Sequence, residues 1–371
     1  MVGTMEFKRA KVNFQYGGYE VNNGMFKLLV LLIFLVLLLS VIQCLLMFSS
    51  CKENGINLRY SNYENIQRSK NSLNQGTPLP PSPKTTARIT KTNKETQMER
   101  QQILRNFCRY NQTKDQLRRS KPLMNNMFYS EKKEIIYCSI PKAACTNWKR
   151  LLQVFDGRMK DLFQVKDKDQ LHNMKYSMLR NLNETELAWR RNSYYAFVFV
   201  RHPFERLFSA YRNKLKQPAH PGFQKRYGSV ILRMFRVNLS KAEYDAGKGV
   251  TFKEFLMYLI SVHQKKGHKA FDEHWQIMTK LCSPCTMKYD FIGKMDTLLQ
   301  DAEEVLKQTG LYEKYKFPYN ATDNYRESAN SVMMRFYLEI PKSFLRTLYN
   351  IYRDDFISFG FSGKQFGLED S

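Results

Sequence analysis

The sequence predicts an α/β fold with a central parallel sheet flanked by helices, and two stretches of the chain indicate it. Residues 134–140 are rich in β-forming residues and end at Pro141. Residues 195–200 form an uninterrupted apolar run, which is typical of a strand buried on both faces of a parallel sheet. Both stretches lead into cationic and hydroxyl residues and then a helix. With 371 residues, the chain is long enough for one large domain of this class with appendages.

The loop after the first strand has the chemistry of an anion-binding turn. Backbone N–H groups at the start of a helix point outward and carry partial positive charge, so they attract phosphate or sulfate. Lys142 adds a point charge and Thr146 adds a hydroxyl donor. We interpret Cys145 as a packing or backbone position and not as a nucleophile. The predicted loop comprises Pro141, Lys142, Ala143, Ala144, Cys145, Thr146 and Asn147.

The second strand leads into a helix that also carries anion-binding groups. Arg201 follows the strand directly, Pro203 suits the first turn of a helix, and Ser209 lies about two turns further on. Open α/β sheets bind ligands at the carboxyl ends of their strands, where Arg201 is expected. Two such units predict a ligand with two separate anionic ends. The apolar residues that recur at helical spacing are Phe204, Leu207, Phe208, Tyr211 and Leu215.

The C-terminal half is predicted to add a further strand to the sheet and helices that pack on it. Residues 289–292 have the pattern of a further strand. The helix that follows places its apolar residues on one face and stops at Gly310. A last amphipathic helix near residues 342–356 is expected to cover the sheet.

The charge of the chain favours a polyanionic ligand. The formal net charge is +25, and residues 101–150 and 201–250 each hold 11 Lys and Arg against 3 Asp and Glu. These two windows contain the two anion-binding units, so positive charge is concentrated around them. Nucleic acid, the usual alternative for a basic chain, is disfavoured because no nucleic-acid motif is present and because the N-terminus directs the protein to a membrane.

An apolar segment near the N-terminus predicts a membrane anchor. Residues 28–51 carry no formal charge across 24 positions, which is enough to span the hydrocarbon core and longer than the apolar region of a cleaved signal peptide. We predict a signal anchor with residues 1–27 as a cytoplasmic tail, an orientation that the basic residues before the span modestly favour. Residues 52–104 are predicted to be an extended, poorly ordered luminal stem, and residues 105–371 the luminal catalytic domain.

Sequons and cysteines are consistent with an oxidising lumen. Cys282 and Cys285 form a Cys-x-x-Cys pair, but no second pair or nearby His pair completes a tetrahedral zinc site. A disulfide is therefore the preferred interpretation, and its pairing stays open. All four glycosylation sequons lie on the predicted luminal side: Asn111, Asn183, Asn238 and Asn320.

Both units resemble motifs of the Golgi carbohydrate sulfotransferases. Residues 141–149 (Pro-Lys-Ala-Ala-Cys-Thr-Asn-Trp-Lys) are similar to their 5′-phosphosulfate loop, and residues 201–212 to their 3′-phosphate motif. The closest group is the chondroitin and dermatan 4-O-sulfotransferases, with the enzymes of the sulfated glucuronyl epitope and of N-acetylgalactosamine. His202 departs from the family, which more often has an acidic residue there, although a cation is compatible with phosphate. The similarity covers most of residues 105–361 and includes residues 272–275, 282–285, 289–294 and 352–356.

The resemblance implies a P-loop-like sulfotransferase domain, a Golgi type II membrane location and the donor 3′-phosphoadenylyl sulfate, without a metal. Lys142 would stabilise the bridging oxygen of the donor, while Thr146 and the loop amides would hold the 5′-phosphate. Arg201 and Ser209 would hold the 3′-phosphate. The residues that would frame this second site are His202, Pro203, Phe204, Glu205, Arg206, Leu207 and Phe208.

The acceptor implied by the resemblance is an anionic glycan, with the 4-hydroxyl of N-acetylgalactosamine in chondroitin or dermatan as the leading hypothesis. Glucuronic acid and terminal N-acetylgalactosamine remain alternatives. His274 is the predicted base, because Asp272 or Glu273 could orient its ring, and an acidic base stays open as well.

The motifs disfavour two other functional classes. A P-loop nucleotide phosphotransferase would carry a Gly-x-x-x-x-Gly-Lys-[Ser/Thr] motif, and Arg201 stands where its Mg²⁺-binding Asp is expected. A catalytically silent glycan-binding protein is disfavoured by the intact set of Lys142, Thr146, Arg201 and Ser209. The sequence makes no prediction of oligomeric state.

Overall fold

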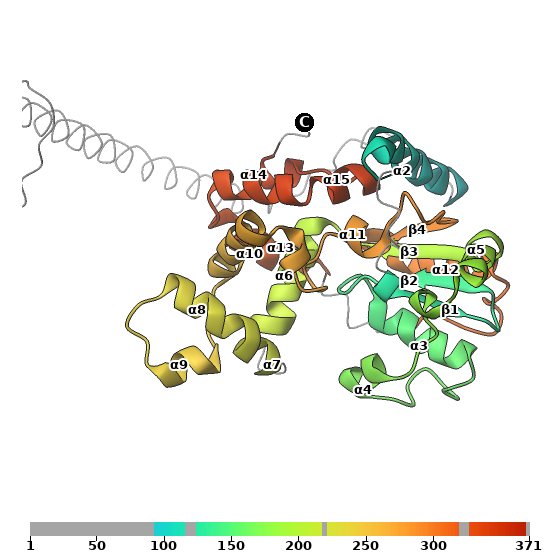
Figure 1. Ribbon diagram of the computed structural model, residues 1–371, viewed down its shortest axis with the longest axis horizontal. Coiled ribbons are helices and arrows are strands. Elements are labelled where there is room, and N and C mark those ends of the chain that lie inside the picture. Colours follow the sequence, from blue (N-terminus) through green and yellow to red (C-terminus); the bar gives the residue numbers. More distant parts are fainter. Residues whose placement is uncertain (1–92, 116–123, 217–220, 319–325, 369–371) are drawn as a thin grey trace, which may run out of the picture. The chain divides into compact units, whose positions relative to one another are not determined.

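The computed structural model describes residues 93–115, 124–216, 221–318 and 326–368 (Figure 1). The predicted cytoplasmic tail, the apolar segment and most of the stem lie outside these ranges. Within the described ranges, no helix combines the length and the apolar character that a membrane crossing requires.

The centre of the domain is a four-stranded sheet in the order β1-β2-β3-β4. Strands β2 (Ile135–Cys138), β3 (Tyr195–Val200) and β4 (Phe291–Lys294) are parallel, as the sequence predicts. Strand β1 (Met127–Ser130) departs from the prediction, because it pairs antiparallel with β2 at the edge of the sheet. The carboxyl ends of the three parallel strands therefore meet at one edge.

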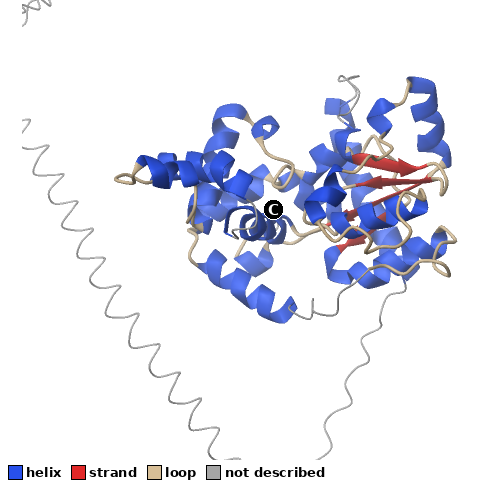
Figure 2. Cartoon of the chain, turned by 90° about the horizontal axis from the view of Figure 1, so that it is seen from below, coloured by secondary structure: helices blue, strands red, loops and turns tan. Residues whose placement is uncertain are grey.

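Helices cover both faces of this sheet (Figure 2). On one face, α3 (Cys145–Phe155) and α12 (Leu298–Gln308) pack against aromatic residues of the parallel strands. Trp148 of α3 is fully buried there, between Phe197 and Phe199 of β3 and Phe317. The predicted end of the α12 helix is confirmed, because Gly310 has a φ of 69° directly after it.

The opposite face is covered by α2 (Asn93–Asp115), α5 (Glu184–Ser193), α11 (Met278–Cys282) and the end of α15 (Arg353–Phe359). The position of α2 corrects the predicted stem, since residues 93–104 are helical and belong to the folded domain. Arg100 pairs with Asp301 at 2.8 Å, and Gln97 donates to the carbonyl oxygen of Ile292. These polar contacts explain why composition alone indicated an unstructured segment.

A helical lobe stands beside the sheet and has its own core, to which no strand contributes. It is formed by α6 (Pro203–Tyr211), α8 (Ser229–Phe235), α10 (Phe252–Lys266), α13 (Arg326–Leu338) and α14 (Lys342–Ile351). The predicted last helix is divided into α14 and α15, and α14 packs against α10 instead of covering the sheet. Three shorter helices are α4 (Lys168–Asn173), α7 (Pro221–Phe223) and α9 (Lys241–Ala246).

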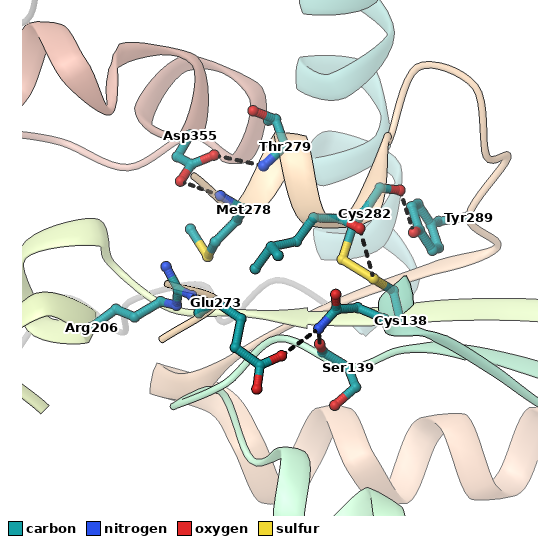
Figure 3. Close-up of a disulfide and its surroundings, with 11 residues drawn as sticks. Cys138, Ser139, Arg206, Glu273, Met278, Thr279, Cys282, Tyr289 and Asp355 are labelled. Carbon is teal, nitrogen blue, oxygen red and sulfur yellow. Dashed lines mark hydrogen bonds between the residues drawn. A yellow bond between two sulfur atoms is a disulfide. The ribbon is translucent and has the colours of Figure 1, made fainter. Parts of the chain in front are cut away.

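Two disulfides connect the layers. Cys138 of β2 is bonded to Cys282 (Figure 3), and Cys108 of α2 is bonded to Cys285. The disulfide interpretation of the Cys-x-x-Cys pair is thus confirmed, with each cysteine bonded to a distant partner and not to its neighbour. Cys145 is a free thiol.

Candidate active site

The two predicted anion-binding units lie next to each other at the carboxyl edge of the sheet. Lys142 follows β2 and Arg201 follows β3, which are neighbouring parallel strands. Nη1 of Arg201 is 3.5 Å from the carbonyl oxygen of Lys142. The structure therefore brings the loop at 141–147 and the start of α6 into one site.

The loop between β2 and α3 presents unpaired amide groups. Lys142 and Ala144 have φ values of 72° and 60°, so two residues with positive φ precede the start of α3. Among the described residues, the N–H groups of Lys142, Ala144, Cys145 and Thr146 find no backbone acceptor. Successive free amides at a helix N-terminus form a concave site for an anion.

The ammonium group of Lys142 is available to such an anion. It makes no hydrogen bond or ion pair with the described residues. Burial lowers the pKa of Lys142 to about 8, and the positive charges of Arg201 and Lys214 add to this effect, while Cys145 opposes it. An anion that binds beside Lys142 would stabilise the charged form of this lysine, which burial otherwise destabilises.

Thr146 is linked to a histidine of α4. Its Oγ1 lies 3.3 Å from Nε2 of His172, which comes from α4, and Nδ1 of His172 lies 3.0 Å from Nζ of Lys149. Because an ammonium only donates, Nδ1 accepts and Nε2–H donates to the threonine hydroxyl. Burial lowers the pKa of His172 to about 4, with nearby positive charges contributing, so the ring is neutral at neutral pH. No motif marks His172, since its role depends on how α4 packs against α3.

The second unit places Arg201 beside an acid. Nε of Arg201 lies 3.3 Å from Oε2 of Glu205, and both side chains are partly exposed. Glu205 and Ser209 are four residues apart on α6 and therefore share one face of the helix. Glu205 is thus placed to orient the guanidinium group of Arg201 at the predicted 3′-phosphate site.

His202 is not the cation that the sequence suggested. It is the N-cap of α6, where Nδ1 accepts from the N–H of Phe204 and Nε2 donates to the carbonyl oxygen of Ser362. Its ring is buried against Phe356 and Phe366. Burial lowers the pKa of His202 to about 4, so the side chain is neutral and caps the helix.

Arg206 is also removed from the donor-binding set, since it is buried and bonded to backbone oxygens. Its guanidinium group donates to the carbonyl oxygens of Pro141 at 2.9 Å, Glu273 at 2.7 Å and Gln276 at 2.6 Å. It thereby ties the loop after β2 to the segment that carries His274. Four other predicted residues have buried side chains that pack inside the protein: Ala143, Phe204, Leu207 and Phe208. Pro203 occupies the first turn of α6, as predicted. Asn147 donates to the carbonyl oxygen of Pro318.

His274 and Asp272 form an oriented pair. Nδ1 of His274 lies 2.7 Å from Oδ1 of Asp272, and the other carboxylate oxygen accepts from the hydroxyl of Tyr227 at 2.9 Å. The Nδ1–H therefore donates to the carboxylate, and Nε2 carries the lone pair. Nε2 has no hydrogen-bond partner among the described residues. Burial lowers the pKa of His274, whereas the hydrogen bond and charge of Asp272 raise it.

The segment that follows His274 is held by hydrogen bonds from residues near the C-terminus of the chain. The carboxylate of Asp355 accepts from the N–H groups of Met278 and Thr279 at 2.7 and 2.8 Å (Figure 3). The hydroxyl of Tyr352 donates to the carbonyl oxygen of Trp275. With Arg206 on the other side, residues 272–279 are fixed relative to the loop that holds Lys142.

Two of the predicted glycosylation sites can be located. Asn183 and Asn238 are exposed. Asn183 also caps α5, because its Oδ1 accepts from the N–H of Glu186. The side chains of Asn111 and Asn320 lie outside the part of the chain that the structure describes.

The sequence matches known proteins across most of the described domain. The model of a family described as "Sulfotransferase family" matches residues 125–362. Carbohydrate sulfotransferase 11 of Rattus norvegicus is 37% identical over 270 residues, which cover 72% of this chain and 76% of that protein. Carbohydrate sulfotransferase 9 of Homo sapiens is 33% identical, with coverages of 73% and 61%, and carbohydrate sulfotransferase 14 of Homo sapiens is 34% identical, with coverages of 65% and 61%. No solved structure matches the chain.

Proposed function

Because this chain belongs to the carbohydrate sulfotransferase family, we propose that it transfers a sulfuryl group from 3′-phosphoadenylyl sulfate to a hydroxyl group of a glycan. One observation carries the proposal above all. The free amides and the unpaired ammonium of the 141–147 loop lie directly beside Arg201 at the tip of the neighbouring strand. A donor with a phosphosulfate at one end and a 3′-phosphate at the other fits these two cationic groups.

The residues present suit this donor. The amides of the loop and the hydroxyl of Thr146 would hold the 5′-phosphate, with His172 keeping that hydroxyl in place. Arg201, oriented by Glu205, and Ser209 would hold the 3′-phosphate. We propose no metal in this reaction.

The donor, when bound, supplies an activated sulfuryl group attached to a phosphate. Lys142 would neutralise the negative charge that develops on the phosphate oxygen. His274 would accept the proton of the acceptor hydroxyl at Nε2, while Asp272 holds the ring and stabilises its protonated form. In this scheme His274 is the catalytic base and Asp272 is a positioning residue.

We further propose that the acceptor is the 4-hydroxyl of N-acetylgalactosamine in chondroitin or dermatan. The motif resemblance and the concentration of positive charge around the site support this acceptor. Glucuronic acid and terminal N-acetylgalactosamine are the alternatives. The protein would act in the Golgi lumen, held by residues 28–51 as a single-pass type II anchor and glycosylated at its exposed sequons.

Transfer of labelled sulfate tests the proposal directly. The full chain is incubated with labelled 3′-phosphoadenylyl sulfate and a panel of desulfated glycans, and disaccharide analysis then identifies the sugar and hydroxyl that carry the label. The expected result is label on N-acetylgalactosamine with wild type and a loss with Lys142→Ala. Absence of label on every glycan, or undiminished transfer by Lys142→Ala, would overturn the proposal.

A further inference from the structure

Lys214 occupies a position where an apolar residue is expected. The helix α6 continues into a π-helical turn at Arg212–Lys216, and π-helical turns are frequent at functional sites. Lys214 follows the buried Leu207 and Tyr211 at the spacing of the apolar face, and only 9% of it is exposed. Burial of a lysine costs free energy unless the ammonium group is paired. Its position therefore calls for a partner.

The ammonium group of Lys214 lies close to the proposed base. Its Nζ is 4.5 Å from the centre of the Phe223 ring, and the same ring is 5.1 Å from the ring of His274. One aromatic side chain thus contacts both groups. The positive charge of Lys214 also lowers the pKa values of His274 and Lys142, which places it in the same electrostatic environment.

The described residues provide no anionic partner for Lys214. It makes neither a hydrogen bond nor an ion pair with any of them, and its contact with Phe223 is a cation–π interaction. The acid that attracts it most is Asp169 of α4, which is exposed, followed by Asp272 and Glu273, and none of the three forms an ion pair with it. Asp272 accepts from His274 and Tyr227, and Glu273 accepts from Asn126.

The position of Lys214 favours the acceptor as the source of the anion. In the proposed function, which this inference rests on, the donor phosphates already have Lys142, Arg201 and the loop amides. His274 contacts the acceptor hydroxyl, so a group that shares Phe223 with His274 lies on the acceptor side. We propose that Lys214 binds the carboxylate of a uronic acid next to the sugar that receives the sulfate, and that it selects uronic-acid-containing glycans.

Two acceptors and two variants test the role of Lys214. The acceptors are desulfated chondroitin and the same polymer with its carboxyl groups reduced to hydroxymethyl groups. Lys214→Met removes the charge and keeps an unbranched apolar side chain over Phe223. Lys216→Met is the matched control, because Lys216 belongs to the same π-helical turn but lies over Phe336 and is exposed.

Loss of a charge-assisted hydrogen bond predicts a selective effect on KM. Wild type should have a KM about 10-fold higher for the reduced polymer than for chondroitin. Lys214→Met should raise the KM for chondroitin by about the same factor and leave the KM for the reduced polymer and for the donor within about 2-fold of wild type. Lys216→Met should retain the wild-type preference.

Any other outcome would overturn either the role of Lys214 alone or the proposed function as well. An equal loss on both polymers, or a raised donor KM, would show that Lys214 serves the donor or the fold. Wild type that uses both polymers equally well, or labels only neutral glycans, would overturn the role of Lys214 and leave the sulfotransferase proposal intact. Wild type that labels no glycan at all would overturn the proposed function, and this inference with it.

Discussion

The Nδ1 atom of His274 and the Oδ1 atom of Asp272 lie 2.7 Å apart, and this contact leaves Nε2 as the free nitrogen of the ring. The same carboxylate is held by the backbone N–H of His274 and by the hydroxyl of Tyr227. The pair thus has the orientation that general-base catalysis needs before any substrate arrives.

We expect His274→Ala to lower kcat by about 10²- to 10⁴-fold, because the acceptor hydroxyl loses its base. His263→Gln, a substitution in α10, is the control and should have little effect. Only the neutral ring accepts a proton, so the wild-type rate should fall as the pH drops below the pKa of His274. Asp272 raises that pKa, and Asp272→Asn should therefore move the acid limb of kcat/KM to lower pH. An acid limb that is the same in wild type and Asp272→Asn would exclude His274 as the titrating base.

The lowered pKa of Lys142 predicts that donor binding weakens at alkaline pH. Its pKa in the free enzyme is lowered to about 8, so the ammonium is present below this pH and is lost above it. The apparent Kd for the donor should rise about 10-fold between pH 7 and pH 9, because only about one tenth of the lysine is charged at pH 9. Lys142→Arg stays charged and should show no such rise. Equilibrium titration with the donor measures this, and a flat wild-type profile would contradict the assignment.

His202 predicts a loss of stability in mild acid. Its pKa is about 4 in the folded protein, below the ordinary value of 6.5, because the ring is buried. The unfolded chain therefore binds a proton between these values while the folded chain does not, and the free energy of unfolding falls as the pH drops from 6.5 toward 4. The contribution of His202 between pH 7 and pH 5 is about 2 kcal/mol.

The substitution His202→Asn isolates this contribution. Asparagine retains an acceptor for the N–H of Phe204 but does not titrate. Urea unfolding at the two pH values should give a smaller pH dependence for the variant than for wild type. His172, whose pKa is also lowered to about 4, contributes equally to both proteins. An unchanged pH dependence would mean that His202 is protonated in the folded state.

Arg206 predicts a stability effect that the sequence did not suggest. Lysine cannot reproduce three hydrogen bonds to separate carbonyl oxygens, so Arg206→Lys should lower the free energy of unfolding by about 2–4 kcal/mol. Arg212→Lys, on the partly exposed side of the same helix, is the control and should cost less than about 1 kcal/mol. Chemical denaturation measures both. If Arg206→Lys unfolds like the control and raises only the donor KM, Arg206 binds the donor after all.

Much of the sheet and the donor loop could be predicted from local sequence. The boundaries of β3 agree with the apolar run at 195–200, because a strand buried on both faces needs apolar residues at every position. Pro203 marked the first turn of α6 for steric reasons that need no tertiary context, whereas β2 ends at Cys138, before the Pro141 that was predicted to end it. The edge strand β1 escaped prediction because its four residues are too short to show a period.

Other features depend on partners that a linear pattern does not reveal. The helix α2 has few apolar residues and joins the domain through side chains such as Arg100. Arg206 and His202 belong to residue types that bind phosphate when exposed, but burial assigned them to backbone oxygens. His172 acquires its contact with Thr146 only when α4 packs beside α3.

The two disulfides have a consequence for biosynthesis. Cys108 and Cys138 leave the ribosome well before their partners, which follow 177 and 144 residues later. During that interval Cys108, Cys138 and Cys145 are thiols without their final partners, and any pair formed among them must be opened before Cys282 and Cys285 can react. The yield of correctly folded enzyme should therefore depend on disulfide isomerase capacity, since thiol–disulfide reshuffling takes seconds to hours. Production in a reducing compartment would yield a chain whose donor loop and base segment lack their covalent link.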